Sequence, residues 1–244
     1  MNLKNKTAVI SGANRGIGKA LVHELLKRGV KKVYAGARQL GSLPDFADVR
    51  VVPLQLDITK KQQVGSAAKI AADADLLINN AGVAAFTSLL GDEPDLFERD
   101  MQTNYYGTLE MMRAFIPVLE GKEGAAIVNV VTVAAFVNFP VLGGYSASKA
   151  ALFSASQGVR IELAPRKIAV HTVNPGPIDT DMTQAMDMPK ASAEETARRI
   201  AEGLEAGDVD IFPDDSGSQM FGVWKGDYRK LEQMVHNMHH GIES

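Results

Sequence analysis

The sequence has no cysteine, no long apolar run and no excess of basic residues. The missing cysteine excludes disulfide bonds and thiol catalysis. No run approaches the roughly 18 apolar residues of a membrane span, and residues 1–6 are not the apolar segment of a signal peptide. A formal net charge of −3 offers no basic surface to nucleic acid or to anionic membranes. These absences favour a cytoplasmic protein with neither kind of partner.

The 244 residues, of which 45% are hydrophobic and 23% charged, suffice to bury a sizeable core. This length allows one large α/β domain or two small ones. The chain contains no internal repeat, low-complexity tract or linker-like boundary. We therefore expect a single domain over residues 1–244, with a cofactor half at roughly 1–120 and a catalytic and substrate half at roughly 121–244.

Short apolar, β-branched runs alternate along the chain with helix-capable or loop-like sequence. This alternation is typical of a doubly wound parallel sheet with helices on its faces. We expect an α/β fold of the Rossmann type with about seven strands. The expected strands are residues 7–10, 33–37, 49–54, 75–78, 125–131, 168–173 and 209–212.

Helices are expected where apolar residues recur with a helical period or where a capping box precedes them. Thr59 and Ser192 each begin such a box. Polar Asn104 interrupts the apolar stripe of the longest helix, and if it disturbs that helix it could hold a water. The stripe consists of Leu96, Met101, Tyr105, Leu109, Met112 and Ile116. The expected helices are residues 19–27, 59–72, 95–119, 192–206 and 227–238, and one that carries Tyr145 and stops before Pro165, with a loop from residue 214 to the last helix.

A glycine-rich turn joins the first expected strand to the first helix. Gly12, Gly16 and Gly18 follow the spacing Gly-x-x-x-Gly-x-Gly rather than the commoner Gly-x-Gly-x-x-Gly. Such a turn lets backbone N–H groups and a helix N-terminus approach a pyrophosphate without an intervening Cβ. The strand before the turn and the helix after it favour dinucleotide binding over a purely structural turn.

Tyr145 and Lys149 stand four residues apart in the segment from Gly143 to Ala151. On a helix this spacing places both side chains on one face. A neighbouring ammonium favours the phenolate and lowers the pKa of the phenol, so that Tyr145 could serve as a general acid or base. The pair alone has little weight, because any tyrosine will sometimes have a lysine at this distance.

Polar and small residues also follow the expected strands, where a ligand would lie across the carboxyl ends of the sheet. Asp57 follows the third strand and either reaches the adenine side of a nucleotide or is a turn aspartate. The run Asn79-Asn80-Ala81-Gly82 ends the fourth strand, Thr132 ends the fifth, and a rigid turn containing Pro175 and Gly176 follows the sixth.

These features have the order and spacing of the short-chain dehydrogenase/reductase family, which the chain resembles over nearly its whole length. The resemblance implies that Tyr145 is the catalytic acid and base, that Lys149 lowers its pKa and holds the nicotinamide ribose, and that Asn104 helps to seat the water of a proton relay. Ser11 stands where the family usually has threonine. Thr132 stands where it usually has serine, and keeps a hydroxyl that would polarise a carbonyl while adding a methyl group.

The resemblance and the strand-end pattern together imply a cofactor site that extends across both halves of the chain. Ile178 and Thr180 match positions that contact the nicotinamide carboxamide. The expected cofactor-binding residues are Gly12, Asn14, Arg15, Gly16, Ile17, Gly18, Arg38, Asp57, Asn80, Ala81, Gly82, Tyr145, Lys149, Pro175, Gly176, Ile178 and Thr180.

The end of the second strand favours NADP(H) over NAD(H). An NAD site usually has a carboxylate about twenty residues past the glycine turn, where it binds the ribose 2'-hydroxyl. Here that position holds Arg38, preceded by uncharged Ala37, and Arg15 offers a second guanidinium from the turn. Guanidinium groups match phosphate geometry well. Asp45 and Asp48, in the loop beyond the strand, leave an NAD-type site open.

The sequence therefore predicts an NADP(H)-dependent oxidoreductase that reduces a ketone or aldehyde and oxidises an alcohol in reverse. The alternative is a non-catalytic dinucleotide-binding regulator on the same fold, motivated by Thr132. Apolar residues after the strand ends favour a hydrophobic substrate, although ordinary core packing would explain each of them as well. They are Ala84, Ala85, Phe86, Ala134, Phe136, Val137, Phe139, Leu142, Met182, Met186 and Met188.

Two further expectations concern assembly and metal. The stripe at residues 95–119 and small residues on the Tyr145 helix lie on helices that form subunit interfaces in the family, which predicts a homotetramer or homodimer. Those small residues are Ala147, Ala150, Ala151, Ser154 and Ala155. No metal is expected, because His236, His239 and His240 lack an accompanying pattern of acidic ligands and are read as surface residues.

Overall fold

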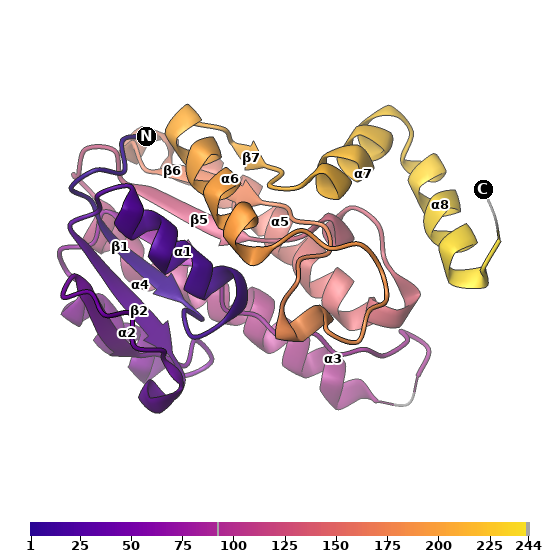
Figure 1. The fold of residues 1–244 in the computed structure, drawn as a ribbon, viewed down its shortest axis with the longest axis horizontal. Coiled ribbons are helices and arrows are strands. Elements are labelled where there is room, and N and C mark those ends of the chain that lie inside the picture. Colours follow the sequence, from indigo (N-terminus) through magenta and orange to yellow (C-terminus); the bar gives the residue numbers. More distant parts are fainter. Residues whose placement is uncertain (92, 243–244) are drawn as a thin grey trace.

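The computed structural model describes residues 1–91 and 93–242. Within them seven strands form one sheet in the order β3-β2-β1-β4-β5-β6-β7, and every pair is parallel. This confirms the predicted doubly wound Rossmann-type fold (Figure 1). The strands are β1 (Thr7–Ser11), β2 (Lys32–Ala37), β3 (Val51–Gln55), β4 (Leu76–Asn79), β5 (Ala126–Val130), β6 (Ala169–Val173) and β7 (Asp210–Ile211).

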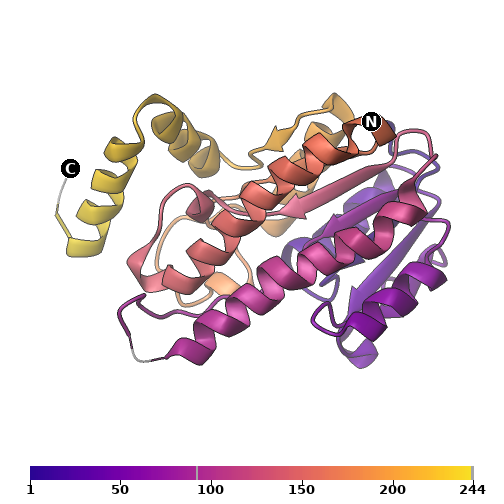
Figure 2. The same ribbon diagram turned by 180° about the vertical axis from the view of Figure 1, so that it is seen from behind.

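Helices cover both faces of the sheet (Figures 1 and 2). α1 and α6 pack side by side over one face, while α2, α4 and α5 cover the other. None of the described helices is both long and apolar enough to cross a membrane. The helices are α1 (Gly16–Lys27), α2 (Lys61–Ile70), α3 (Pro94–Asp100), α4 (Thr108–Leu119), α5 (Gly143–Leu163), α6 (Ala193–Ala206), α7 (Asp215–Gly226) and α8 (Tyr228–His240).

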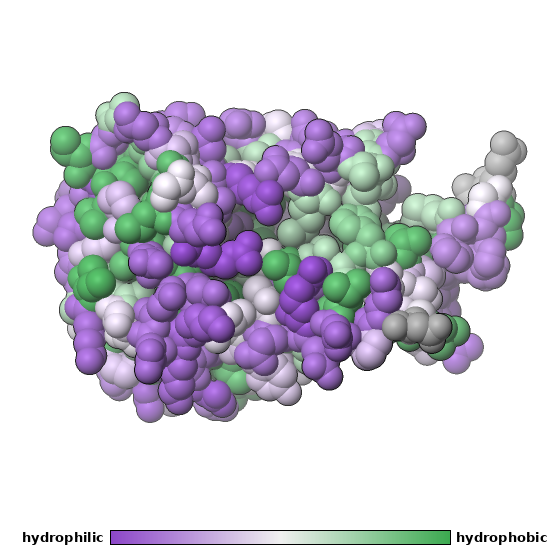
Figure 3. Space-filling view, turned by 90° about the horizontal axis from the view of Figure 1, so that it is seen from below, coloured by the Kyte–Doolittle hydropathy of each residue, from purple (hydrophilic) through white to green (hydrophobic). Residues whose placement is uncertain are grey.

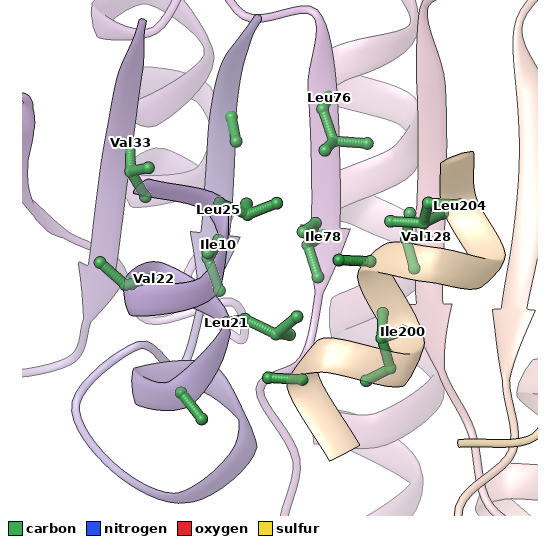
Figure 4. Close-up of a cluster of buried hydrophobic side chains, with 14 of the residues drawn as sticks. Ile10, Leu21, Val22, Leu25, Val33, Leu76, Ile78, Val128, Ile200 and Leu204 are labelled. Atoms are coloured by element: carbon green, nitrogen blue, oxygen red, sulfur yellow. The ribbon is translucent and has the colours of Figure 1, made fainter. Parts of the chain in front are cut away.

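The central strands are apolar on both faces because each face meets a helix layer. Successive side chains of a strand point to opposite faces. Ile10 accordingly lies in one buried cluster with Leu21 of α1 and Ile200 of α6 (Figure 4), whereas its neighbour Val9 lies in the cluster of the other layer, with Phe115 of α4. The two cores fix the carboxyl ends of β1, β4 and β5 at one edge of the sheet, where the predicted site residues follow.

The long helix predicted at residues 95–119 is present but contains a π-helix, η2 (Met101–Gly107), between α3 and α4. The wider π turn brings Asp100, Asn104 and Thr108 onto the fully buried face. Along the predicted apolar stripe Met112 is fully buried, and the other five positions are only partly buried. A disturbance of the helix at Asn104 was the predicted condition for holding a water, and the π-helix is such a disturbance.

Two local predictions failed. Thr59 does not cap α2, because its hydroxyl and its N–H both donate to the carboxylate of Asp57, 2.7 and 3.0 Å away. The predicted loop from residue 214 contains α7, whose glycines obscure its helical pattern. The carboxylate of Asp214 caps this helix by accepting from Gly217 N–H at 2.7 Å. By contrast, Ser192 caps α6 as predicted and accepts from Glu195 N–H at 3.1 Å.

Candidate active site

A cleft of about 1040 Å³ lies at the carboxyl ends of the central strands. Figure 3 shows a hollow in the face of the molecule toward which β1 and β2 point. Gly18 and Asn104 are the two predicted site residues that do not line this cleft. The residues that do are Gly12, Asn14, Arg15, Gly16, Ile17, Arg38, Asp57, Asn80, Ala81, Gly82, Thr132, Tyr145, Lys149, Pro175, Gly176, Ile178 and Thr180.

The glycine turn presents backbone rather than side chains to this cleft. Gly12 and Gly16 have φ angles of 68° and 51°, a region that side chains disfavour. A Cβ on Gly18 would lie 2.1 Å from the carbonyl oxygen of Gly12, so α1 packs directly on the turn. Since α1 begins at Gly16, its N-terminal N–H groups face the cleft. The arrangement fits a pyrophosphate, which needs close N–H donors.

Side-chain hydrogen bonds tie the turn to the end of β4. The Ser11 hydroxyl accepts from the backbone N–H groups of Asn80 and Ala81, each at 3.1 Å. The Asn80 amide donates to the carbonyls of Ser11 and Gly12 at 3.1 and 3.0 Å. The Ser11 hydroxyl alone accepts these backbone hydrogen bonds, so serine in place of the family's usual threonine keeps the turn intact.

Tyr145 and Lys149 lie on one face of α5, and Thr132 follows β5 on the wall of the same cleft. The ammonium of Lys149 lies 5.8 Å from the centroid of the Tyr145 ring and donates to the carbonyl of Val130 at 2.6 Å. The hydroxyl of Thr132 donates to the carbonyl of Pro175 at 3.0 Å. The end of β5 and helix α5 thus bring a phenol, a lysine and a second hydroxyl to one cleft.

Burial shifts the protonation of both residues toward their neutral forms. Removal from water raises the pKa of Tyr145 to about 12, an effect that the Thr132 hydroxyl opposes and the charge of Asp100 reinforces. Removal from water lowers the pKa of Lys149 to about 8, which the charge of Asp100 opposes. The sequence predicted that Lys149 lowers the pKa of Tyr145. In this structure burial raises the pKa of Tyr145 instead, and the Lys149 ammonium donates to the carbonyl of Val130.

Asn104 is fully buried in η2, and its side chain binds protein groups. Its amide donates to the carbonyl of Val83 at 2.8 Å and to the Ser148 hydroxyl at 2.9 Å, while its oxygen accepts from Val83 N–H at 2.9 Å. Both amide hydrogens are used. Asn104 therefore anchors the loop after β4 to α5.

Near the end of β2 the cleft is lined by two cationic side chains, Arg38 and Arg15. Arg38 is exposed beside Ala37, while Arg15 forms an ion pair with Asp181 at 2.9 Å across the cleft. Asp48 is held by Arg50 at 2.7 Å. The carboxylate of Asp45 accepts from a backbone N–H of its own loop at 2.8 Å. The two loop aspartates are thus engaged locally.

Among the predicted substrate-contacting residues, Met182 lines the cleft. Ala85, Ala134 and Leu142 are buried in the protein. Phe136 packs in an aromatic cluster, with ring centroids 5.0 Å from Trp224. Core packing therefore explains these four residues.

The histidines of α8 lie close together: the ring centroids of His236 and His239 lie 4.5 and 4.9 Å from that of His240. The described part of the chain has no group of three or more His, Cys, Asp or Glu that could hold a metal.

Sequence reasoning missed two buried carboxylates. Asp100 is fully buried one helical turn before Asn104 and accepts from Ala85 N–H at 2.9 Å. Asp214 accepts from Gly176 N–H at 2.8 Å while it caps α7. The spacing of Asp100 and Asn104 was a usable signal, because residues four apart share a helix face. Nothing local marks the pairing of Asp214 with a turn 38 residues away.

Comparison with known proteins agrees with this geometry. Residues 6–191 match the family model for short chain dehydrogenases. The 3-oxoacyl-[acyl-carrier-protein] reductase FabG of Vibrio cholerae is 30% identical over 193 residues, which are 77% of this chain and 79% of that protein. A short chain dehydrogenase from Burkholderia cenocepacia, solved in complex with NADP, aligns with a TM-score of 0.92 and 39% identity over 96% of this chain and 99% of its own.

A second solved structure with 26% identity is the 3-ketoacyl-(acyl-carrier-protein) reductase of Brucella melitensis in complex with NADH. It has a TM-score of 0.79 and covers 88% of this chain and 99% of its own. Both similar structures hold a nicotinamide dinucleotide, as the cleft geometry suggests for this fold. The chain belongs to the short-chain dehydrogenase/reductase family of oxidoreductases.

Proposed function

We propose that the protein is an NADP(H)-dependent reductase of ketones or aldehydes that oxidises the corresponding alcohol in the reverse direction. The observation that carries this proposal is the meeting of Tyr145, Lys149 and Thr132 on the wall of a cleft whose other end is a glycine turn. A non-catalytic regulator would need the cleft but not this set. The intact Tyr145 and Lys149, with a hydroxyl retained at position 132, favour the enzyme.

In this mechanism Tyr145 is the general acid. With a pKa of about 12 the phenol is protonated at neutral pH and can donate its proton to the oxygen of a carbonyl as that oxygen gains negative charge. Thr132 polarises the same oxygen, for which its hydroxyl must leave the carbonyl of Pro175. The ammonium of Lys149 stabilises negative charge on Tyr145 once the proton has left.

The nicotinamide supplies the hydride when the cofactor is bound. The turn at Gly12 and Gly16 would hold its pyrophosphate, and Ile178 and Thr180 would lie along its nicotinamide. In this proposal Asn104 acts indirectly. It binds Val83 and Ser148, so it positions the loop and the helix that carry the other residues.

We propose NADP(H) rather than NAD(H) because Arg38 and Arg15 line the cleft while no carboxylate follows β2 directly. The NADP complex of the Burkholderia cenocepacia protein supports this choice. The kcat/KM for NADPH should exceed that for NADH, and Ala37→Asp combined with Arg38→Ala should reverse the order. A wild-type preference for NADH, or an unchanged preference in Arg38→Ala, would show that the 2'-phosphate site is misplaced.

The substrate class is proposed as hydrophobic ketones or aldehydes. Met182 lines the cleft, and Phe86 and Met188 are exposed apolar side chains in segments that follow β4 and β6. A panel of apolar, aromatic, sugar and anionic carbonyls, assayed with both cofactors, tests this directly. Preference for anionic carbonyls would refute the class, and absence of turnover on the whole panel would favour the regulator.

We further propose a single dinucleotide-binding catalytic domain over residues 1–244, located in the cytoplasm, that forms a homodimer or homotetramer. Ala147, Ala150 and Ser154 are exposed on α5 and permit close approach of a second helix. The mostly half-exposed stripe along α3, η2 and α4 supplies apolar area next to them. A monomer in light scattering at working concentration would contradict the assembly.

A further inference from the structure

Two buried polar side chains on one face of α3 and η2 hold the loop that follows β4. Asp100 accepts from Ala85 N–H at 2.9 Å, and one turn later Asn104 binds both the N–H and the carbonyl of Val83. Lys149 lies against the same loop: a Cβ on Gly82 would be 3.5 Å from its ammonium and 3.2 Å from the Asn104 oxygen. Asp100 thus binds a short segment of backbone beside which the ammonium of Lys149 lies.

Both residues would otherwise carry poorly compensated charge. Asp100 is 0% exposed and Lys149 is 4% exposed. Besides Ala85 N–H, Asp100 has a contact at 3.4 Å with Arg99, a half-exposed side chain. Within the described residues, the ammonium of Lys149 forms one hydrogen bond, to the carbonyl of Val130. Burying a carboxylate or an ammonium is costly unless an opposite charge is near, so each residue lowers the cost of burying the other.

We propose that Asp100 is a positioning residue of the catalytic site, which fixes the loop at Ala85 and whose negative charge stabilises the ammonium of Lys149. This inference rests on the proposed function for its effect on turnover, but not for its effect on the folded protein. Nothing in the proposed reaction requires a carboxylate to touch the substrate. A fully buried acid at this position is instead explained by the loop N–H that it binds and by the cation that lies beside the same loop.

The sign of the effect on catalysis follows from the charged groups near Asp100. These are Arg99 on α3 and, on α5, Lys149 and the phenol of Tyr145. Carbonyl reduction needs both α5 groups protonated, so turnover should fall as pH rises through the pKa of Lys149 at about 8. The charge of Asp100 raises the pKa of Lys149 and of Tyr145. Its removal should therefore move the alkaline limb to lower pH.

The first test measures the pH dependence of kcat for carbonyl reduction in Asp100→Asn, which keeps an acceptor for Ala85 N–H but no charge. We expect the alkaline limb to move down by about one pH unit with little change in KM. The matched control is Asp95→Asn, an exposed aspartate on the same helix, whose profile should follow the wild type. An alkaline limb at the wild-type position in Asp100→Asn would overturn the electrostatic role.

The second test needs no turnover, and so separates this inference from the proposed function. Thermal unfolding is measured for wild type, Asp100→Asn, Lys149→Met and the double variant. We expect Asp100→Asn to lower the Tm clearly in the wild-type background and much less in Lys149→Met, because the unpaired ammonium is then gone. If Asp100→Asn folds only together with Lys149→Met, the coupling is also established. Additive shifts, or failure of both Asn variants to fold, would overturn the proposal.

Discussion

Replacing Gly18 by alanine adds only a methyl group, but it should lower both the stability of the fold and the affinity for NADPH. The added Cβ would lie 2.1 Å from the carbonyl oxygen of Gly12 and 2.5 Å from the amide nitrogen of Asn80. Neither neighbour can yield cheaply. The first is backbone in the turn itself, and the second already donates two hydrogen bonds that tie the turn to β4. The turn must therefore open for α1 to keep its place.

The magnitude follows from two opposing effects. Forcing a methyl group into a packed site costs about 1–3 kcal/mol, and contact with backbone places Gly18→Ala near the upper end. Against this, alanine in a helix stabilises the protein by about 0.5–1 kcal/mol relative to glycine, because the unfolded chain then has less conformational freedom to lose. The net loss of about 2 kcal/mol corresponds to a Tm lower by about 4–8 °C for a chain of this size. Because the displaced turn faces the cleft, affinity for NADPH should fall at least about tenfold, equivalent to about 1.4 kcal/mol.

Gly65→Ala is the matched control, because a Cβ on this glycine of α2 would meet nothing within 4 Å. It should raise the Tm by about 1–3 °C and leave NADPH binding unchanged. Differential scanning fluorimetry and fluorescence titration with NADPH measure both quantities. A Gly18→Ala variant with wild-type Tm and affinity would refute the packing argument.

Substitutions at two further residues, Thr132 and Asp214, test hydrogen bonds of the site. Thr132→Ser keeps the hydroxyl and should retain most of kcat. Thr132→Ala should lower kcat by about 10²-fold in steady-state assays, because one charge-stabilising donor is lost. Equal kcat values for Thr132→Ser and Thr132→Ala would exclude Thr132 from the mechanism. Asp214→Ala leaves the N–H groups of Gly176 and Gly217 without their acceptor, and should lower the free energy of unfolding in urea by about 1–2 kcal/mol. Asp214→Asn should lower it by less. An Asp214→Ala variant as stable as Asp214→Asn would contradict the capping role.

Much of the fold could be predicted because its signals are local. β-branched runs such as residues 126–130 are buried on both faces, and the alternation of such runs with helices indicates a parallel sheet. Parallel strands then bring their carboxyl ends together, so most of the residues named after the strands line one cleft. Tyr145 and Lys149 needed only helical spacing to share a face.

The errors arose where distant contacts override local preference. Thr59 fits a capping box, but Asp57 occupies its hydroxyl, and only the three-dimensional turn decides between the two partners. The π-helix at Asn104 changes which positions of the long helix are buried, and a regular period cannot anticipate it. Asp100 drew no prediction from the sequence. Its burial depends on the loop after β4, which no local pattern places against it.

The central claim is that Tyr145 donates the proton in carbonyl reduction. The measurement is the rate of NADPH oxidation by Tyr145→Phe with the best carbonyl of the panel, at saturating cofactor and substrate. Loss of a positioned acid should lower this rate by about 10²- to 10⁴-fold, while the NADPH dissociation constant and the Tm stay near wild type because the ring is retained. Turnover by Tyr145→Phe at the wild-type rate would contradict the account.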